Sequence, residues 1–275
     1  MTRIIANCLI VLFVAQIQAQ EKTAQFHLGL ETGFNVFTGQ TNKPDMIREN
    51  RSLYNYYKNY DNYDDYGDYG YIYDFQNVFF THFGVKPEFR LSKYNRFTGA
   101  MGIRYSMSIS TLNSDGSYFF WKINETETSA NYVRIKSITK KNHYIGIPLE
   151  IRFFPRKKES FVRHYFVFGK SFNFLIASEN DISFVDIEMG KYTSNVKEYL
   201  EKPRLFQGNI SAGVGLKIGK TNRPHIRVEF YLPAVAYGKG KINSFSKSSV
   251  LAGMGMFASL QIPILYSKEQ STITY

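Results

Sequence analysis

The chain has 275 residues, a formal net charge of +11 and a strongly aromatic composition, with 24 phenylalanines, 21 tyrosines and one tryptophan. This length allows one large domain or two small ones. After the N-terminal segment no stretch approaches the roughly 18 uninterrupted apolar residues of a spanning helix, which excludes a helical membrane protein. The only cysteine, Cys8, lies in that first segment, which excludes disulfides and thiolate chemistry from the rest of the chain.

Residues 1–19 have the features of a secretory signal peptide. Arg3 precedes the apolar run CLIVLFVA, and Ile17 and Ala19 occupy the −3 and −1 positions of a cleavage site. The run is too short to span a bilayer, so we expect export and removal and not a membrane anchor. Exported proteins seldom meet nucleic acid. We therefore expect the positive charge to face acidic lipid headgroups, with no nucleic-acid partner.

The segment TGAMGIRYSMSIS alternates between apolar and small polar residues with a period of two, which is the pattern of a β-strand with two different faces. Met101, Ile103 and Tyr105 share one face, and Arg104 lies on the other. The same pattern recurs along the chain and predicts eight strands: Phe26–Val36, Phe79–Leu91, Thr98–Ser110, Asn142–Phe154, Val162–Ile176, Phe206–Ile218, Ile226–Ala236 and Val250–Tyr266.

Alternation alone also fits a soluble β-sandwich, whose apolar face points inward. Two features favour a membrane barrel. The polar faces are mostly Gly, Ser, Thr and Asn, whereas a solvated sheet face carries more long charged side chains. The connections also alternate between short and long, as in outer-membrane barrels. The short ones are Ser92–Arg96, Pro155–Ser160 and Lys220–Pro224, and the long ones are Gly39–Asp74, Asn113–Lys141, Ser178–Arg204 and Gly238–Ser249.

The sequence therefore predicts an all-β protein over residues 20–275, an eight-stranded antiparallel transmembrane β-barrel in the outer membrane of a Gram-negative cell. A sheet in hydrocarbon must close on itself to satisfy its backbone, which places the apolar faces against lipid and the polar faces in the lumen. Long loops, including 39–74, would be extracellular, and the short turns and the tail 267–275 would be periplasmic.

Eight strands leave an interior that side chains can fill, so we expect a packed polar core and not a wide channel. We favour structural ion pairs over a selectivity ring for a conducted solute. Lys170 falls on the lipid face, where a charge does not fit. The predicted lumen charge network is Lys86, Glu88, Arg90, Arg104, Glu150, Arg152, Arg163, Arg227 and Glu229, with Lys217 on the same inward set.

The first long loop is rich in tyrosine, with Asn, Asp and Gly and almost no aliphatic residues. It fits either a surface contact loop or an outer loop that lies near the membrane interface. Four aspartates in it, Asp61, Asp64, Asp65 and Asp68, match no calcium-loop spacing, so we expect no metal. The candidate contact residues are Tyr54, Tyr56, Tyr57, Tyr60, Tyr63, Tyr66 and Tyr69. In the second loop, SYFFWK fits an aromatic girdle or a β-hairpin above the bilayer.

An outer-membrane enzyme needs a nucleophile with a positioned base. His143 lies at an outer strand end, and Ser110 or Ser137 could lie near it. No G-x-S-x-G elbow accompanies them, and there is no phosphate loop or metal-ligand cluster. We therefore expect no enzymatic activity and no cofactor.

Three segments resemble the PorT-like outer-membrane β-barrel family: YIGIPLEIRFFP (Tyr144–Pro155), HYFVFGKSFNFLI (His164–Ile176) and GNISAGVGLKIG (Gly208–Gly219). The resemblance implies an outer-membrane barrel. One branch of that family is linked to type IX protein secretion, so envelope or secretion proteins are the implied partners besides outer-membrane lipids. The alternatives are a narrow transport pore and a lipid-modifying enzyme.

Overall fold

The computed structural model describes residues 26–48, 75–92, 96–113, 118–125, 130–156, 158, 160–200, 202–238, 245 and 249–264. The predicted signal peptide, the seven candidate contact tyrosines and the predicted tail lie outside these residues. No helix in the described part of the chain is long and apolar enough to cross a membrane.

Eleven strands in the described residues belong to one sheet, and the prediction of an all-β antiparallel protein is confirmed. Two short helices, η1 (Ile187–Tyr192) and α3 (Thr193–Tyr199), follow β8. The strands are β1 (Phe26–Gln40), β2 (Ile47–Arg48), β3 (Phe75–Arg90), β4 (Phe97–Met101), β5 (Ile103–Asn113), β6 (Phe119–Glu125), β7 (Ala130–Phe153), β8 (Val162–Phe184), β9 (Phe206–Ile218), β10 (His225–Tyr237) and β11 (Val250–Ile264).

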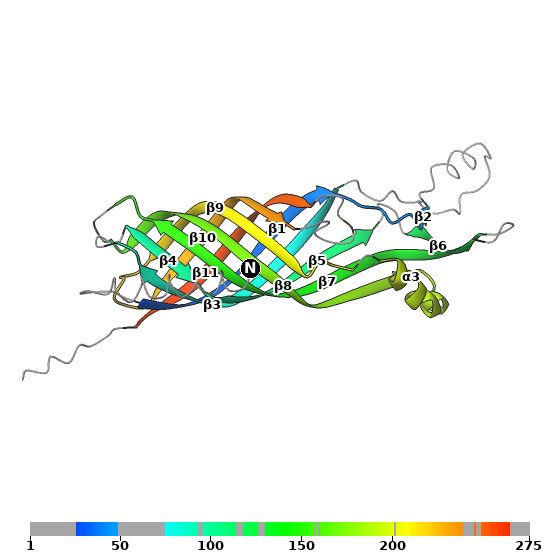
Figure 1. Ribbon diagram of the computed structural model, residues 1–275, viewed down its shortest axis with the longest axis horizontal. Helices are drawn as coiled ribbons and strands as arrows, with labels where there is room; N and C mark the ends of the chain where they lie inside the picture. The colour runs from blue at the N-terminus through cyan, green and yellow to red at the C-terminus, as the bar shows by residue number, and fades with distance from the viewer. Residues whose placement is uncertain are drawn as a thin grey trace, which may run out of the picture.

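The strand pairings form a closed circuit, which we call the ring (Figure 1). β1 pairs with β3 on one side and with β11 on the other. From β3 the circuit passes through β4 and β5 to β7, and then through β8, β9 and β10 back to β11. Closure gives each ring strand a hydrogen-bonded neighbour on both sides, so the ring has no free edge.

β4 and β5 act as a single strand of the ring, as the sequence pattern predicts for Thr98–Ser110. Ala100 pairs with Glu88 and Arg104 pairs with Gly84, so the register against β3 is the same on both sides of the break. Gly102 lies at the break, and a Cβ atom there would collide with the carbonyl oxygen of Val85. A glycine at this position lets the two backbones approach closely.

The two faces of the ring strands differ as the alternation predicts. Outward-facing apolar side chains are exposed, with 61% for Phe83 and 66% for Ile103. Their inward-facing neighbours are buried, with 3% exposure for His82 and 5% for Arg104. Most large side chains on the outside are therefore apolar, with Lys170 as an exception, and most charged side chains of the ring strands lie inside.

A β-bulge in β10 overturns part of this prediction. The register shifts between Tyr231 and Ala234, so one extra residue of β10 enters the ladder on both sides. A one-residue insertion reverses the faces of everything after it. The alternation of Ile226–Ala236, continued without interruption, predicts that Ala234 and Ala236 face outward and Tyr237 inward. In the structure Ala234 and Ala236 are fully buried in the ring, and Tyr237 lies outward against Gly208.

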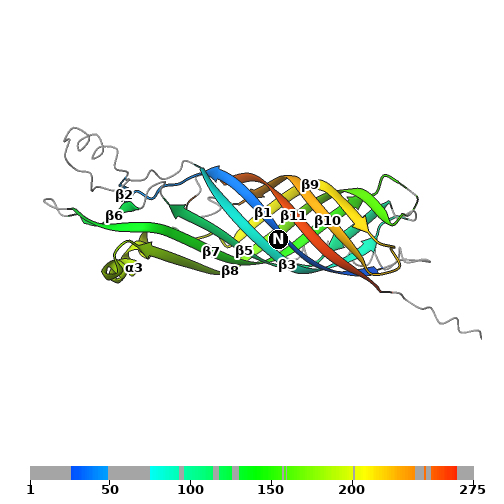
Figure 2. The same ribbon diagram turned by 180° about the vertical axis from the view of Figure 1, so that it is seen from behind.

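The second difference concerns the predicted long loops Asn113–Lys141 and Ser178–Arg204, parts of which are strands. β7 begins at Ala130 and β8 continues to Phe184, so both strands extend well beyond the end of the ring (Figure 2). β6 pairs with the first part of β7, from Ala130 to Ile135, and β2 pairs with β6. These pairings bear out the hairpin interpretation of SYFFWK. We use the name cap for the region formed by β2, β6, η1, α3 and the parts of β7 and β8 that extend beyond the ring.

The cap has an apolar core of its own. A bulge between Ile135 and Ser137 changes which face of β7 is buried, so that odd-numbered residues point inward above it. The buried members of this core are Leu112, Phe119, Trp121, Ile123, Val133, Ile135, Ile138, Val196, Leu200 and Phe245.

Candidate functional site

The candidate site is the interior of the ring, where four carboxylates meet four cations. Each side chain comes from an inward position of a ring strand, so the strand period of two places all of them around one axis. We call this set the charge network: Glu31, Lys86, Glu88, Arg104, Glu150, Arg152, Arg227 and Glu229.

Glu31 and Glu150 share the cations Lys86 and Arg104. Lys86 Nζ is 2.5 Å from Glu31 Oε2 and 2.6 Å from Glu150 Oε2. Arg104 donates from Nε to Glu31 Oε1 at 2.7 Å and from Nη2 to Glu150 Oε1 at 3.4 Å. Two carboxylates and two cations thus neutralise each other in a four-membered cluster.

Arg152 joins this cluster to the other half of the network. Its Nη2 donates to Glu150, its Nη1 donates to Glu88 Oε2 at 2.9 Å, and its Nε donates to Glu229 Oε1 at 2.6 Å. Arg227 donates both of its terminal nitrogens to Glu88. Arg152 is fully buried, and all three of its guanidinium nitrogens donate to carboxylates. This arrangement makes a buried charge tolerable.

Aromatic side chains complete the shell around the network. The hydroxyls of Tyr165 and Tyr231 each donate to Glu229 at 2.8 Å. The guanidinium of Arg104 lies 4.8 Å from the ring centre of Phe257. These contacts satisfy carboxylate lone pairs and place an aromatic ring against the Arg104 cation.

The structure places the predicted lumen residues in two groups. Seven of the nine belong to the charge network. Arg163 instead donates to the carbonyl oxygen of Arg156 at 2.6 Å and lies over Phe154, while Arg90 is half-buried at the end of β3. Lys217 is buried and donates to the hydroxyl of Thr221.

Glu31 is the network member that the prediction missed. It lies on the inward face of Phe26–Val36 by the same alternation that identified the others, so the signal was present in the sequence. Without Glu31 the network would hold four cations against three carboxylates.

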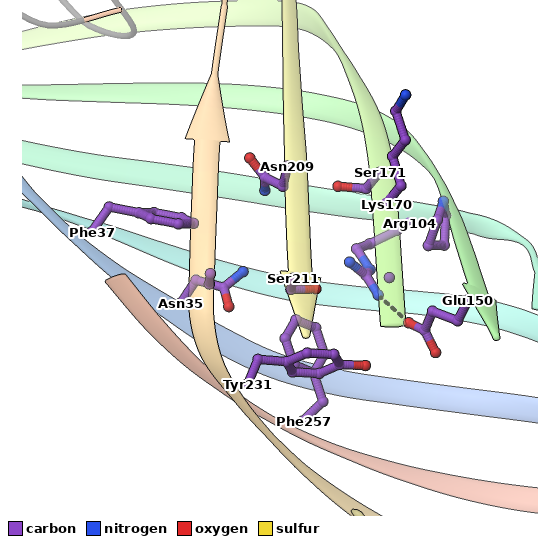
Figure 3. Close-up of a pocket in the computed structure, with 13 residues that line it drawn as sticks. Asn35, Phe37, Arg104, Glu150, Lys170, Ser171, Asn209, Ser211, Tyr231 and Phe257 are labelled. Atoms are coloured by element: carbon purple, nitrogen blue, oxygen red, sulfur yellow. Dashed lines mark hydrogen bonds and ion pairs between the residues drawn. The ribbon is translucent and has the colours of Figure 1, made fainter. Parts of the chain in front are cut away.

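A small cavity lies beside the network, next to Arg104 and Glu150 (Figure 3). Its volume is about 20 Å³, which is room for a water molecule and not for a solute. Asn35, Ser171 and Asn209 line it together with Arg104 and Glu150. The interior is therefore filled at this level.

Further toward the cap, most inward-facing polar groups of the ring are neutral, although Lys140 is also buried there. His82 contacts Ser106 Oγ through Nδ1 at 2.8 Å and Asn35 Nδ2 through Nε2 at 2.9 Å. Its ring also stacks on Phe257 with a centroid separation of 5.2 Å. Ser106 has no exposed surface, so this buried Asn–His–Ser row has no access to a substrate.

The geometry does not assemble the lipid-modifying site considered from sequence. His143 lies on the outward face of β7 and contacts the hydroxyl of Tyr105 through Nδ1 at 2.6 Å. Ser110 is buried on the inward face, and Ser137 is six positions away along the same strand. Neither serine can reach the imidazole. No group of three or more metal-binding side chains occurs in the described residues.

One ion pair stands out in the cap. Arg134 donates from Nη2 to both carboxylate oxygens of Asp186, at 3.0 and 2.9 Å, and lies over the ring of Tyr118. The hydrogen bonds to Asp186 raise the pKa of Arg134 above its usual value. This pair ties β7 to the segment that leads into η1.

No known protein family and no curated protein matches the sequence, so the resemblance to the PorT-like family remains a prediction. Three solved structures align with most of the chain. Neisserial surface protein A is 11% identical with a TM-score of 0.35, and covers 88% of this chain and 99% of its own. Ail, the attachment invasion locus protein of Yersinia pestis, is 10% identical with a TM-score of 0.29, covering 87% and 99%. The outer membrane protease OmpT from Escherichia coli is 9% identical with a TM-score of 0.28, covering 88% and 96%. These scores carry no argument about what this chain does.

Proposed function

We propose that the ring is an eight-stranded β-barrel that spans the outer membrane of a Gram-negative cell, and that the protein is a non-enzymatic structural or partner-binding component of the envelope. The eight positions around the barrel are β1, β3, the combined β4 and β5, β7, β8, β9, β10 and β11. The described turns between β7 and β8 and between β9 and β10 would face the periplasm, and the cap would lie outside the cell.

The observation that carries this proposal is the contrast between the two faces of the ring. Side chains such as Phe83, Ile103 and Phe168 are more than half exposed, and each lies on an outward position. In water so large an apolar surface would drive aggregation, whereas in lipid it needs no cover. The closed hydrogen-bond circuit meets the second requirement of a hydrocarbon environment, because no backbone edge is left unsatisfied.

The filled interior favours a structural role over transport. The charge network crosses the lumen from Glu31 in β1 to Arg152 in β7, and it is neutral overall. An ion that passed would have to break several buried charge-assisted hydrogen bonds at once. The work of the protein would then be done by its surfaces, namely the cap, the tyrosine-rich loop and the periplasmic end, toward envelope or secretion proteins.

The proposal is tested by reconstituting the protein, extracted from outer membranes, in planar bilayers. We expect heat-modifiable migration on gels, because a closed barrel resists unfolding in detergent, and almost no conductance. A steady conductance would establish the alternative function, a narrow transport pore. Migration that heating does not change would contradict the barrel itself.

A further inference from the structure

The end of the ring opposite the cap carries a concentration of positive charge that the proposed function does not use. The turn between β7 and β8 places Arg156 and Lys158 in solvent, and the turn between β9 and β10 does the same for Lys220 and Arg223. Glu159, the one acidic residue in these turns, lies outside the described residues, as does Lys157. We call Arg156, Lys158, Lys220 and Arg223 the basic end face.

The two turns lie next to each other because their strands are neighbours. The amide of Gly219 donates to the carbonyl oxygen of Phe161 at 2.7 Å, which joins the end of one turn to the start of the other. Four exposed cations therefore gather on one side of the ring opening. Exposed charges of one sign within a Debye length of each other, roughly 8 to 10 Å, reinforce each other's field.

The positive charge continues from the turns into the ring. Arg163 lies directly beneath Arg156 and donates to its carbonyl oxygen. Lys217 pairs across the sheet with Arg163 on one side and with Arg227 on the other, so three inward-facing cations lie side by side on the wall. Arg227 is neutralised by Glu88, and Arg163 and Lys217 carry the positive charge toward the turns.

We propose that the basic end face binds an acidic segment of a periplasmic protein, whose carboxylates contact Arg156, Lys158, Lys220 and Arg223. This inference rests on the orientation given in the proposed function. Phospholipid headgroups surround the barrel only from outside, where the wall ends in the exposed apolar residues Phe161 and Val162. Arg163 and Lys217 instead lie on the inward face of the wall, so the positive charge extends toward the ring opening, which a ligand from the periplasm approaches.

The test uses the mature protein in phosphatidylcholine nanodiscs, with a fluorescent peptide of alternating glutamate and glycine as the probe. The end-face variant carries Arg156→Gln, Lys158→Gln, Lys220→Gln and Arg223→Gln. A matched control carries Lys136→Gln, Lys191→Gln, Lys197→Gln and Lys202→Gln, which removes the same charge from the other end of the molecule. Fluorescence anisotropy measures peptide affinity at several salt concentrations.

We expect the end-face variant to lose roughly tenfold or more in affinity, and the control to lose less than about twofold, with the wild-type binding weakening steeply as salt rises. Equal losses in the two variants, or no binding by the wild type, would overturn the proposal. So would loss of co-purified phosphatidylglycerol from the end-face variant at unchanged peptide affinity, because the cations would then hold lipid. Heat-modifiable migration of both variants separates these outcomes from failure of the barrel.

Discussion

The ring and the cap solve the same packing problem in opposite ways. Inside the ring, buried side chains such as Arg152 and Glu229 are charged, and the large apolar ones face outward. Inside the cap, Trp121 and Ile135 are fully buried in an apolar core. A protein in water gains stability by burying apolar surface, whereas a sheet surrounded by lipid gains nothing from it and gathers its polar groups inside.

β7 belongs to both regions and shows where one arrangement gives way to the other. Below its bulge, Lys140, Asn142 and Tyr144 face the ring interior, and above it Val133 and Ile135 face the cap core. The bulge lets a single continuous strand bury its polar face in one region and its apolar face in the next.

The largest effect is expected from breaking the charge network at Glu150. Glu150→Leu leaves Lys86, Arg104 and Arg152 without a shared partner, and loss of one member of a buried ionic cluster costs about 3–5 kcal/mol. The measurement is the free energy of unfolding in lipid vesicles from urea titration. Glu179→Gln, an exposed change on the extension of β8, is the control and should cost less than about 0.5 kcal/mol.

A change of similar kind in the cap is expected to affect the cap alone. Ile135→Ala removes buried apolar volume and should destabilise the cap by about 3 kcal/mol. Trp121, the sole tryptophan, lies in the same core and reports cap unfolding by its fluorescence. Gel migration of the unheated ring should not change. Simultaneous loss of both signals would contradict the separation of the two regions.

The smallest expected effects come from the lipid face. Lys170 lies outward between Phe168 and Phe172 on β8, with its ammonium 4.8 Å from the Phe172 ring. Replacing it with leucine should stabilise the barrel in a bilayer by about 1–2 kcal/mol, and Ile103→Lys should destabilise it by about 2–3 kcal/mol. Urea titration in vesicles measures both. Destabilisation by Lys170→Leu together with no loss of stability in Ile103→Lys would place these faces away from lipid.

The alternation of side chains was enough to predict which residues face the interior, because it depends only on the extended backbone. It assigned Arg104 and Glu150 to the inward set, and it carried Glu31 as well. It could not predict which of these side chains meet. Lys86 reaches Glu150, 64 positions away, because β3 and β7 pair with opposite sides of β4 and β5, and no local pattern encodes that register.

The same dependence on period explains the misplaced residues. An extra residue at Leu232–Pro233 reverses the phase of β10, and a sequence pattern extended without that insertion places Ala236 on the wrong face. The first part of β7, from Ala130 to Lys141, was not predicted as a strand for a related reason. Lys140 and Lys141 put polar side chains on both faces just below a bulge, so the alternation is interrupted where the strand passes from ring to cap.

The most direct test of the account is site-directed spin labelling along β5 in lipid vesicles. The only native cysteine lies in the predicted signal peptide, so each single-cysteine variant at residues 103–109 carries one labelling site in the mature protein. We expect labels at Ile103, Tyr105 and Met107 to collide with oxygen dissolved in the acyl chains, and labels at Ser106 and Ser108 to be shielded from it. Equal oxygen accessibility at every position, or the reverse alternation, would contradict the claim that the apolar face of the ring meets lipid.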